Sequence, residues 1–216
     1  MAMLRAEAPP SRPQTLPGFD HVQRAWDRHC DRWSARILPG EYFVTRNDEV
    51  ITTVLGSCIS ACMRDPVLGC GGMNHFMLPE DLTNGSSSWL DPAVGLATRY
   101  GSFAMESLIN DLLKLGARRE RLEVKLTGGG RILASMTDVG SRNIEFARRW
   151  LSLEGLQIAG EDVGESHARR VQYFPATGRV RMFRLPNLDH AAVISGERQY
   201  QSALREKTAG NDVELF

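Results

Sequence analysis

The chain has 216 residues, of which 42% are hydrophobic and 24% are charged, the composition of an ordinary globular domain. Basic and acidic residues both number 26, so no net charge favours nucleic acid or an anionic membrane. No apolar run reaches the roughly 18–20 residues of a membrane span, and the N-terminus lacks the apolar stretch of a signal peptide. Four cysteines in such a chain indicate reduced thiols in a cytoplasm.

The N-terminal part divides into a tail and an extension. Residues 1–18 are rich in proline, alanine and charge, and we expect a disordered tail. Residues 19–38 predict an amphipathic helix from His21 to Ile37, with an apolar stripe and an arginine stripe on different faces (Val22, Trp26, Cys30, Trp33 and Ile37; Arg24, Arg28, Arg32 and Arg36). We expect this helix to pack on the domain with its arginines in solvent; the alternative is a docking element for a larger assembly.

Residues 39–186 predict a single α/β (α+β) domain around a mixed sheet. Short β-rich segments come first and last in this region (42–45, 51–54, 59–63, 72–77, 122–126, 157–163, 168–174 and 179–185). Between them lie two predicted helices, Ala97–Leu115 and Ser141–Leu153, each followed by a glycine. The polar segment Asp81–Ser88 predicts a mobile loop. Residues 187–216 lose the periodicity, and we expect a partly disordered C-terminal extension.

Cys58 and His75 are the candidate catalytic pair. Cys58 follows an apolar strand-like run that breaks at Gly56-Ser57, and His75 lies in a second apolar segment seventeen positions later. A histidine within reach of a cysteine can take the thiol proton and later return it to a leaving group. The turn before the cysteine can direct backbone N–H groups at a developing oxyanion. Thr52, in the preceding strand, has a hydroxyl that could orient the imidazole.

Other interpretations of these residues remain open at this point. A lone cysteine is most often a small buried hydrophobe, and a lone histidine in an apolar strand is more often a core residue. Zinc binding by Cys58, Cys62, Cys70 and His75 is a further alternative, but the spacing lacks the repeated short gap of structural zinc sites. The 127–130 loop (Thr-Gly-Gly-Gly) could cradle a phosphate, but it lacks the full dinucleotide or P-loop signatures, which favours a tight turn.

Several of these motifs together resemble the CheD family of chemoreceptor glutamine deamidases. They are the run 52–66 (TTVLGSCISACMRDP), the run 71–79 (GGMNHFMLP), Arg99-Tyr100-Gly101, the glycines 128–130, Arg142-Asn143-Ile144 and Glu161-Asp162-Val163-Gly164. The resemblance covers about residues 38–185. It implies a three-layer α/β/α sandwich, similar to the deamidase domain of cytotoxic necrotizing toxins. It also implies catalytic roles for Cys58, His75 and Thr52, and no metal or organic cofactor.

The resemblance implies a cytoplasmic protein-glutamine glutaminase that converts glutamines of methyl-accepting chemotaxis receptors to methylatable glutamates. A CheC-type phosphatase is an implied partner, whereas nucleic acid binding and membrane insertion are not expected. Two alternatives remain. The same residues could serve a transglutaminase-like enzyme or an amidase acting on another substrate, or the chain could be a regulator that acts mainly by binding the phosphatase. The resemblance says little about residues 19–38 or about the chain after residue 186.

Overall fold

The computed structural model describes residues 9–78, 92–132 and 139–209. Its strands form two five-stranded mixed sheets. The first sheet contains, in spatial order, β1 (Gln23–Asp27), β2 (Arg32–Arg36), β4 (Val50–Leu55), β9 (Arg169–Phe174) and β10 (Arg179–Arg184). The second contains β3 (Tyr42–Thr45), β6 (Cys70–Asn74), β5 (Ile59–Asp65), β7 (Glu123–Gly128) and β8 (Ile158–Val163).

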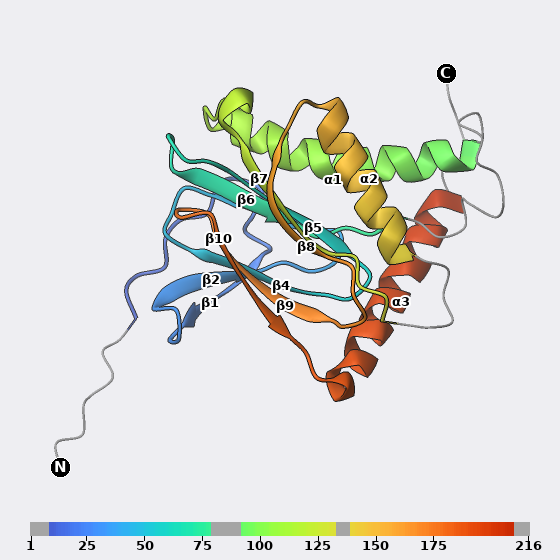
Figure 1. Cartoon of the computed structure of the whole chain (residues 1–216). Helices are drawn as coiled ribbons and strands as arrows, with labels where there is room; N and C mark the ends of the chain where they lie inside the picture. The colour runs from blue at the N-terminus through green and yellow to red at the C-terminus, as the bar shows by residue number, and fades with distance from the viewer. Residues whose placement is uncertain (1–8, 79–91, 133–138, 210–216) are drawn as a thin grey trace, which may run out of the picture.

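Two helices cover the second sheet on one face. Helix α1 (Pro92–Lys114) packs on β3, β5 and β6, and α2 (Val139–Leu153) packs on β5 and β8. Figure 1 shows both helices above the second sheet and the first sheet on its opposite side. One continuous core fills the space between these layers, with buried residues from both sheets and from α1 and α2. A short 3₁₀ turn, Arg119–Arg121, links α1 to β7.

The mixed α/β class and both internal helices are confirmed, but the arrangement of the strands differs from our expectation. We expected one mixed sheet between helical layers, and the described residues form two sheets. The chain changes sheets at residues 56–58, because β4 belongs to the first sheet and β5 to the second. The turn that contains Cys58 therefore lies where the two sheets meet at one end.

The predicted helix His21–Ile37 is wrong: this segment is the antiparallel hairpin β1–β2, with Trp26 opposite Trp33. The two indole rings meet edge to face, with centroids 6.0 Å apart. The Asp27 carboxylate accepts hydrogen bonds from the backbone N–H groups of His29 and Cys30 and so closes the turn. The arginine stripe is not uniformly solvated either, because the side chain of Arg24 is only 3% exposed and pairs with Glu49.

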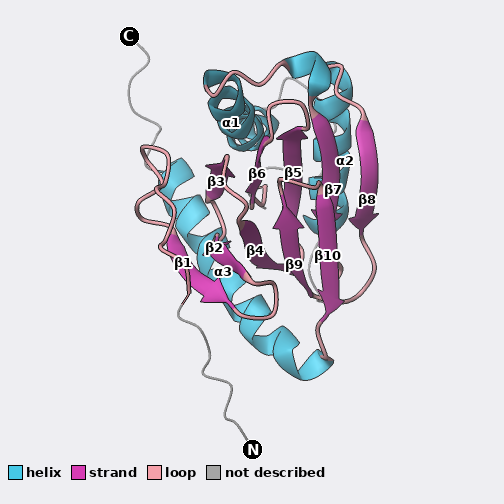
Figure 2. Cartoon of the chain, turned by 90° about the vertical axis from the view of Figure 1, so that its left-hand side faces the viewer, coloured by secondary structure: helices cyan, strands magenta, loops and turns pink. Residues whose placement is uncertain are grey.

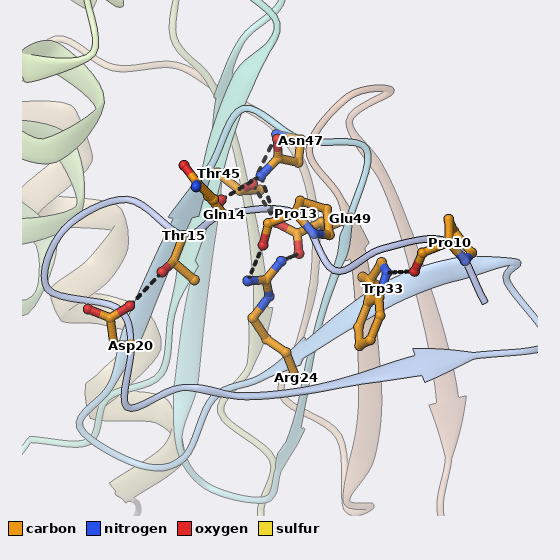
Figure 3. A network of polar contacts seen from close by, with 10 residues as sticks. All are labelled: Pro10, Pro13, Gln14, Thr15, Asp20, Arg24, Trp33, Thr45, Asn47 and Glu49. Atoms are coloured by element: carbon orange, nitrogen blue, oxygen red, sulfur yellow. Dashed lines mark hydrogen bonds and ion pairs between the residues drawn. The ribbon is translucent and has the colours of Figure 1, made fainter. Parts of the chain in front are cut away.

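Residues 9–18, which we expected to be disordered, lie along the hairpin as an extended segment (Figure 3). The backbone carbonyls of Pro10, Pro13 and Gln14 accept hydrogen bonds from Trp33, Arg24 and Asn47. Thr15 donates a hydrogen bond to Asp20. The segment is thus held by the side chains of β1, β2 and the β3–β4 loop.

Helix α3 (Asn187–Ala209) runs through the segment that we expected to be partly disordered. It is the last described element, and Figures 1 and 2 show it running across one end of the sheets. His190 lies near its beginning, where its ring nitrogen Nε2 accepts a hydrogen bond from the backbone N–H of Ala168 at 3.3 Å. The helix therefore returns the end of the chain to the region of the Cys58 turn.

No helix among the described residues is long and apolar enough to cross a membrane. The polar segment Asp81–Ser88, expected to be a loop near the site, lies outside the described residues.

Candidate active site

The backbone carbonyl groups of the Cys58 turn (residues 56–58) fix it in place by accepting hydrogen bonds. The backbone N–H groups of Gly130 and Gly129 donate to the carbonyls of Gly56 and Cys58, each at 2.7 Å. The Ser57 carbonyl accepts a hydrogen bond of 2.8 Å from the side-chain amide of Asn143 on α2. All three carbonyls are thus occupied, and the amide groups of the same residues are left to bind another group.

The glycine-rich loop is therefore a support for the cysteine turn. Gly128 and Gly129 both have positive φ, at 114° and 64°. A Cβ at Gly129 would also lie 2.5 Å from Ile144 of α2, so a side chain there would separate the loop from the helix. This agrees with the tight turn that we preferred to a phosphate cradle, because the N–H groups of residues 129 and 130 are already bonded to the Cys58 turn.

The amide groups of the turn bind a carboxylate from the far end of the chain. Glu197 on α3 accepts hydrogen bonds at Oε1 from the N–H groups of Gly56 (2.9 Å) and Cys58 (3.0 Å). Its Oε2 accepts from the N–H (3.0 Å) and the hydroxyl (2.6 Å) of Ser57. The sequence analysis missed Glu197 entirely. Nothing local marks it, because the contact joins residues about 140 positions apart.

His75 is fixed through its backbone and its ring. Its N–H donates to the Glu41 carbonyl at 2.9 Å, and its own carbonyl accepts from the Gly40 N–H at 2.7 Å. The ring nitrogen Nδ1 lies 2.8 Å from the hydroxyl oxygen of Thr53. This contact bridges the sheets, since Thr53 belongs to β4 and His75 follows β6.

The hydrogen bonds of Thr53 define the tautomer of His75. The Thr53 hydroxyl has one hydrogen, which it donates to the Ile37 carbonyl at 2.8 Å. The hydroxyl oxygen must then accept at its contact with the imidazole, so Nδ1 carries the ring proton. The lone pair is on Nε2, which is buried and has no hydrogen-bond partner in the described structure. The ring is therefore arranged as a proton acceptor with its basic nitrogen unoccupied.

Thr52 does not make the contact that we expected of it. Its hydroxyl donates to the Val171 carbonyl on β9 at 2.9 Å, and the adjacent Thr53 contacts the imidazole. Neighbouring residues of a strand point to opposite faces, so only one of the two threonines can reach the ring. A catalytic role of Thr52 stays a prediction.

One isolated pair of hydrogen bonds places Cys58 and His75 on neighbouring segments. Ile59 and Phe76 exchange both backbone bonds, at 2.9 and 3.0 Å. Cys58 precedes one of these residues and His75 precedes the other, so strand alternation directs both side chains to the same face. Cys58 is 0% exposed and His75 is 2% exposed. The two predicted residues therefore share one buried region beside the 56–58 turn.

Burial keeps both groups uncharged. Burial raises the pKa of the Cys58 thiol well above its usual value, and the nearby Glu197 carboxylate raises it further. Burial lowers the pKa of His75 to about 3. At neutral pH the arrangement is thus a thiol and a neutral imidazole.

The possible zinc ligands do not form a cluster. All four cysteines are free and buried, and no group of three histidine, cysteine or acidic side chains among the described residues is placed to hold a metal ion. Cys62 lies within β5 and Cys70 begins β6, each in a regular strand pair. The arrangement of the described residues therefore gives no support to the zinc alternative.

Comparison with known proteins identifies the family. The model of the family "CheD chemotactic sensory transduction" matches residues 77–184. A "Probable chemoreceptor glutamine deamidase CheD" of Halorhodospira halophila is 50% identical over 94% of this chain and 94% of its own length. The protein of the same description from Hahella chejuensis is 48% identical over 96% of this chain and 97% of its own. The Bacillus licheniformis hypothetical protein YfiH, a solved structure, gives a TM-score of only 0.32 at 12% identity, over 58% of this chain and 50% of that one. With relatives this similar along nearly its whole length, the chain belongs to the CheD family.

Proposed function

We propose that this protein is a cytoplasmic protein-glutamine deamidase, which hydrolyses side-chain carboxamides of methyl-accepting chemotaxis receptors to glutamates. Membership of a family whose relatives are described as chemoreceptor glutamine deamidases supports the substrate class. The single structural observation that supports the chemistry is the buried Nε2 of His75, which has neither a proton nor a hydrogen-bond partner in the described structure, on the same face of a strand pair as Cys58.

The proposed reaction has two halves. In the first, His75 Nε2 takes the thiol proton of Cys58, and the sulfur attacks the carboxamide carbon of a receptor glutamine. The N–H groups of Gly56 and Cys58 stabilise the oxyanion of the tetrahedral intermediate. His75 returns its proton to the nitrogen, and ammonia leaves a γ-glutamyl thioester.

In the second half, a water molecule replaces the ammonia. His75 takes one proton from the water as its oxygen attacks the thioester, and the second intermediate collapses with departure of the Cys58 sulfur. The sulfur recovers its proton, and the glutamate product dissociates. Overall one carboxamide and one water give one carboxylic acid and one ammonia, so atoms balance without an external oxidant or reductant.

The test is conversion of glutamine to glutamate in receptor cytoplasmic fragments, followed by peptide mass spectrometry. The full chain should convert specific glutamines, and Cys58→Ala and His75→Ala should not. Cys62→Ala is the matched control, because Cys62 is an equally buried cysteine in the adjoining strand with no proposed role. Conversion that persists in Cys58→Ala would contradict the mechanism.

Two alternatives are separable in the same experiment. A transglutaminase-like enzyme would join an added primary amine to the glutamine, which gives a different mass from hydrolysis. A regulator that acts by binding would leave receptor glutamines unchanged while it binds a CheC-type phosphatase. Metal analysis of the purified protein tests the zinc alternative directly.

A further inference from the structure

Helix α3 places a glutamate side chain where the proposed reaction would leave one. Glu197 is 7% exposed, and each of its carboxylate oxygens has two donors on the cysteine turn. The same carboxylate raises the pKa of the Cys58 thiol, in addition to the effect of burial. The side chain thus occupies the amide groups of the turn, including the N–H of the nucleophile itself.

The hydrogen-bond donors around Glu197 match a glutamate carboxylate, the proposed product, better than a glutamine carboxamide, the proposed substrate. Oε1 lies between the N–H groups of Gly56 and Cys58, the two donors proposed for the oxyanion. Oε2 faces the N–H of Ser57, which can only donate. A carboxylate satisfies every donor, whereas the NH₂ group of a glutamine at the second position would face another donor.

The surroundings of Glu197 are shaped to receive a helix. Gly56 has no side chain, and a Cβ there would lie 2.9 Å from Glu197 Oε2. One turn further along α3, Tyr200 packs over Gly40, where a Cβ would lie 2.9 Å from the tyrosine oxygen. The Tyr200 hydroxyl is hydrogen-bonded to the hydroxyl of Tyr100 on α1. We define Gly40, Gly56, Ser57, Cys58 and Tyr100 as the helix-docking site.

The face of α3 that meets this site is mostly polar. Among the side chains of α3 that the structure describes, the buried ones recur at helical spacing: His190, Glu197, Gln201 and Leu204. Gln201 Nε2 is buried without a hydrogen-bond partner in the described structure. A helix held mainly by polar contacts buries less apolar surface than a core helix, so its release costs less free energy.

We propose that α3 is an intramolecular pseudo-product: it fills the helix-docking site with Glu197, and it must leave before a receptor helix can present a glutamine to Cys58. This rests on the proposed function, because the comparison with a product requires that the reaction leave a glutamate. The partner that fits the site is a helix that carries an exposed glutamine or glutamate. Such a helix competes with α3, and deamidation is slow while α3 is docked.

The reactivity of Cys58 reports the position of α3 without any turnover. The full chain is treated with iodoacetamide under native conditions, and the alkylation of each cysteine is followed by peptide mass spectrometry. Glu197→Ala and Glu197→Gln should both increase the alkylation rate of Cys58 by at least about tenfold. A tenfold change corresponds to about 1.4 kcal/mol, the scale of one hydrogen bond to a charged group. If Glu197 acted only by filling space, Glu197→Gln would react like the unmodified protein.

The chain provides matched controls. Glu206→Ala removes an exposed glutamate of the same helix, nine residues away and therefore on the opposite side of α3. It should leave the alkylation rate of Cys58 unchanged. Cys30, Cys62 and Cys70 are buried in the same molecule, and their slow alkylation shows that the fold is intact.

A second variant tests the proposal if Glu197→Ala fails to fold. Increased alkylation of all four cysteines in Glu197→Ala would indicate unfolding, and the test then uses Tyr200→Phe, which removes only the hydroxyl that contacts Tyr100. This variant should increase the alkylation of Cys58 alone by roughly threefold to tenfold, since one hydrogen bond is lost. An unchanged Cys58 rate in both Glu197→Gln and Tyr200→Phe would overturn the proposal.

Receptor conversion separates this proposal from the proposed function. Faster Cys58 alkylation together with at least about tenfold faster receptor deamidation in Glu197→Ala supports both. If the wild type deamidates the receptor and Glu197→Ala changes neither the alkylation rate of Cys58 nor the deamidation rate, the role of α3 is overturned and the proposed deamidase function stands. Faster alkylation with no receptor deamidation in any variant overturns the deamidase and the product analogy, while α3 remains a cover of Cys58.

Discussion

A shift of one residue along β4 determines which threonine contacts the imidazole of His75. Thr52 and Thr53 are chemically identical, and the sequence analysis assigned the orienting role to Thr52. In the folded chain Thr53 is 3% exposed and bonds both the Ile37 carbonyl and His75, while Thr52 bonds Val171. The strand boundaries were predicted well, but the inner face of β4 could not be, because apolar residues occur at both alternating sets of positions and only the folded strand shows Thr53 buried and Thr52 half-buried.

We expect Thr53→Val to lower kcat for receptor deamidation by roughly 10- to 100-fold, because the buried Nδ1–H of His75 loses its acceptor and the ring its fixed tautomer. KM should stay unchanged, since Thr53 does not reach the docking site of the receptor. Thr53→Ser should restore most of the activity. Thr52→Val is the matched control, and a larger loss in Thr52→Val than in Thr53→Val would return the role to Thr52.

The depressed pKa of His75 also predicts how stability depends on pH. Burial lowers this pKa from 6.5 to about 3, so the unfolded chain binds a proton between these values that the folded chain does not. Stability from the neutral ring is therefore present above pH 6.5 and is lost as the pH falls toward 3. The loss is up to about 1.4 kcal/mol per pH unit. The free energy of unfolding in urea, measured at several pH values across this window, should change less steeply with pH in His75→Gln than in the wild type. An equal dependence on pH in both proteins would contradict the prediction.

At the scale of elements, the hairpin β1–β2 shows where hydrophobic spacing misled the prediction. Trp26 and Trp33 are seven residues apart, which suits a helical stripe and equally an antiparallel pair across a tight turn. The alternation that would have indicated strands was masked by Arg24, a charged residue that points inward. Its partner Glu49 is 25 positions away, and only the fold brings the two together.

We expect Arg24→Met to destabilise the protein by about 3–5 kcal/mol, because the Glu49 carboxylate would remain buried without its counter-ion. The double variant Arg24→Met with Glu49→Leu should be less destabilised than Arg24→Met alone, since no unpaired charge is left. Both are measured as the free energy of unfolding in urea. Arg148→Met removes the exposed pair with Glu161 and serves as the control, with an expected effect below about 1 kcal/mol. Equal effects of the buried and exposed pairs would refute this account.

At the scale of the molecule, Cys58 and His75 could be predicted from the sequence, whereas the contacts of Asn143 and Glu197 with the Cys58 turn could not. The Cys58 turn directly precedes β5 and His75 directly follows β6, the neighbouring strand, so short-range patterns and the family motifs were sufficient to find them. Asn143 was noticed as part of a motif, but its bond to the Ser57 carbonyl needed the packing of α2. Glu197 was missed because α3 buries a polar face, and polar residues at helical spacing look like a solvated tail.

The last prediction follows from competition between the docking of α3 and the modification of Cys58, which we propose share one site. If α3 and a group on Cys58 exclude each other, then an adduct on Cys58 must weaken the docking of α3. Protein alkylated at Cys58 with iodoacetamide should show hydrogen exchange at least about tenfold faster in the amides of α3 (Asn187–Ala209). Exchange in α2, which packs on the sheet, should stay unchanged.

The control for that measurement is Cys58→Ala treated with the same reagent, which has no sulfur at this position and should keep α3 docked through Glu197. Exchange is read by mass spectrometry of peptides from the two helices, so each sample carries its own internal reference. If the adduct left α3 exchange at the level of the control, α3 and the nucleophile would be independent, and the end of the chain would have to regulate something other than access to Cys58.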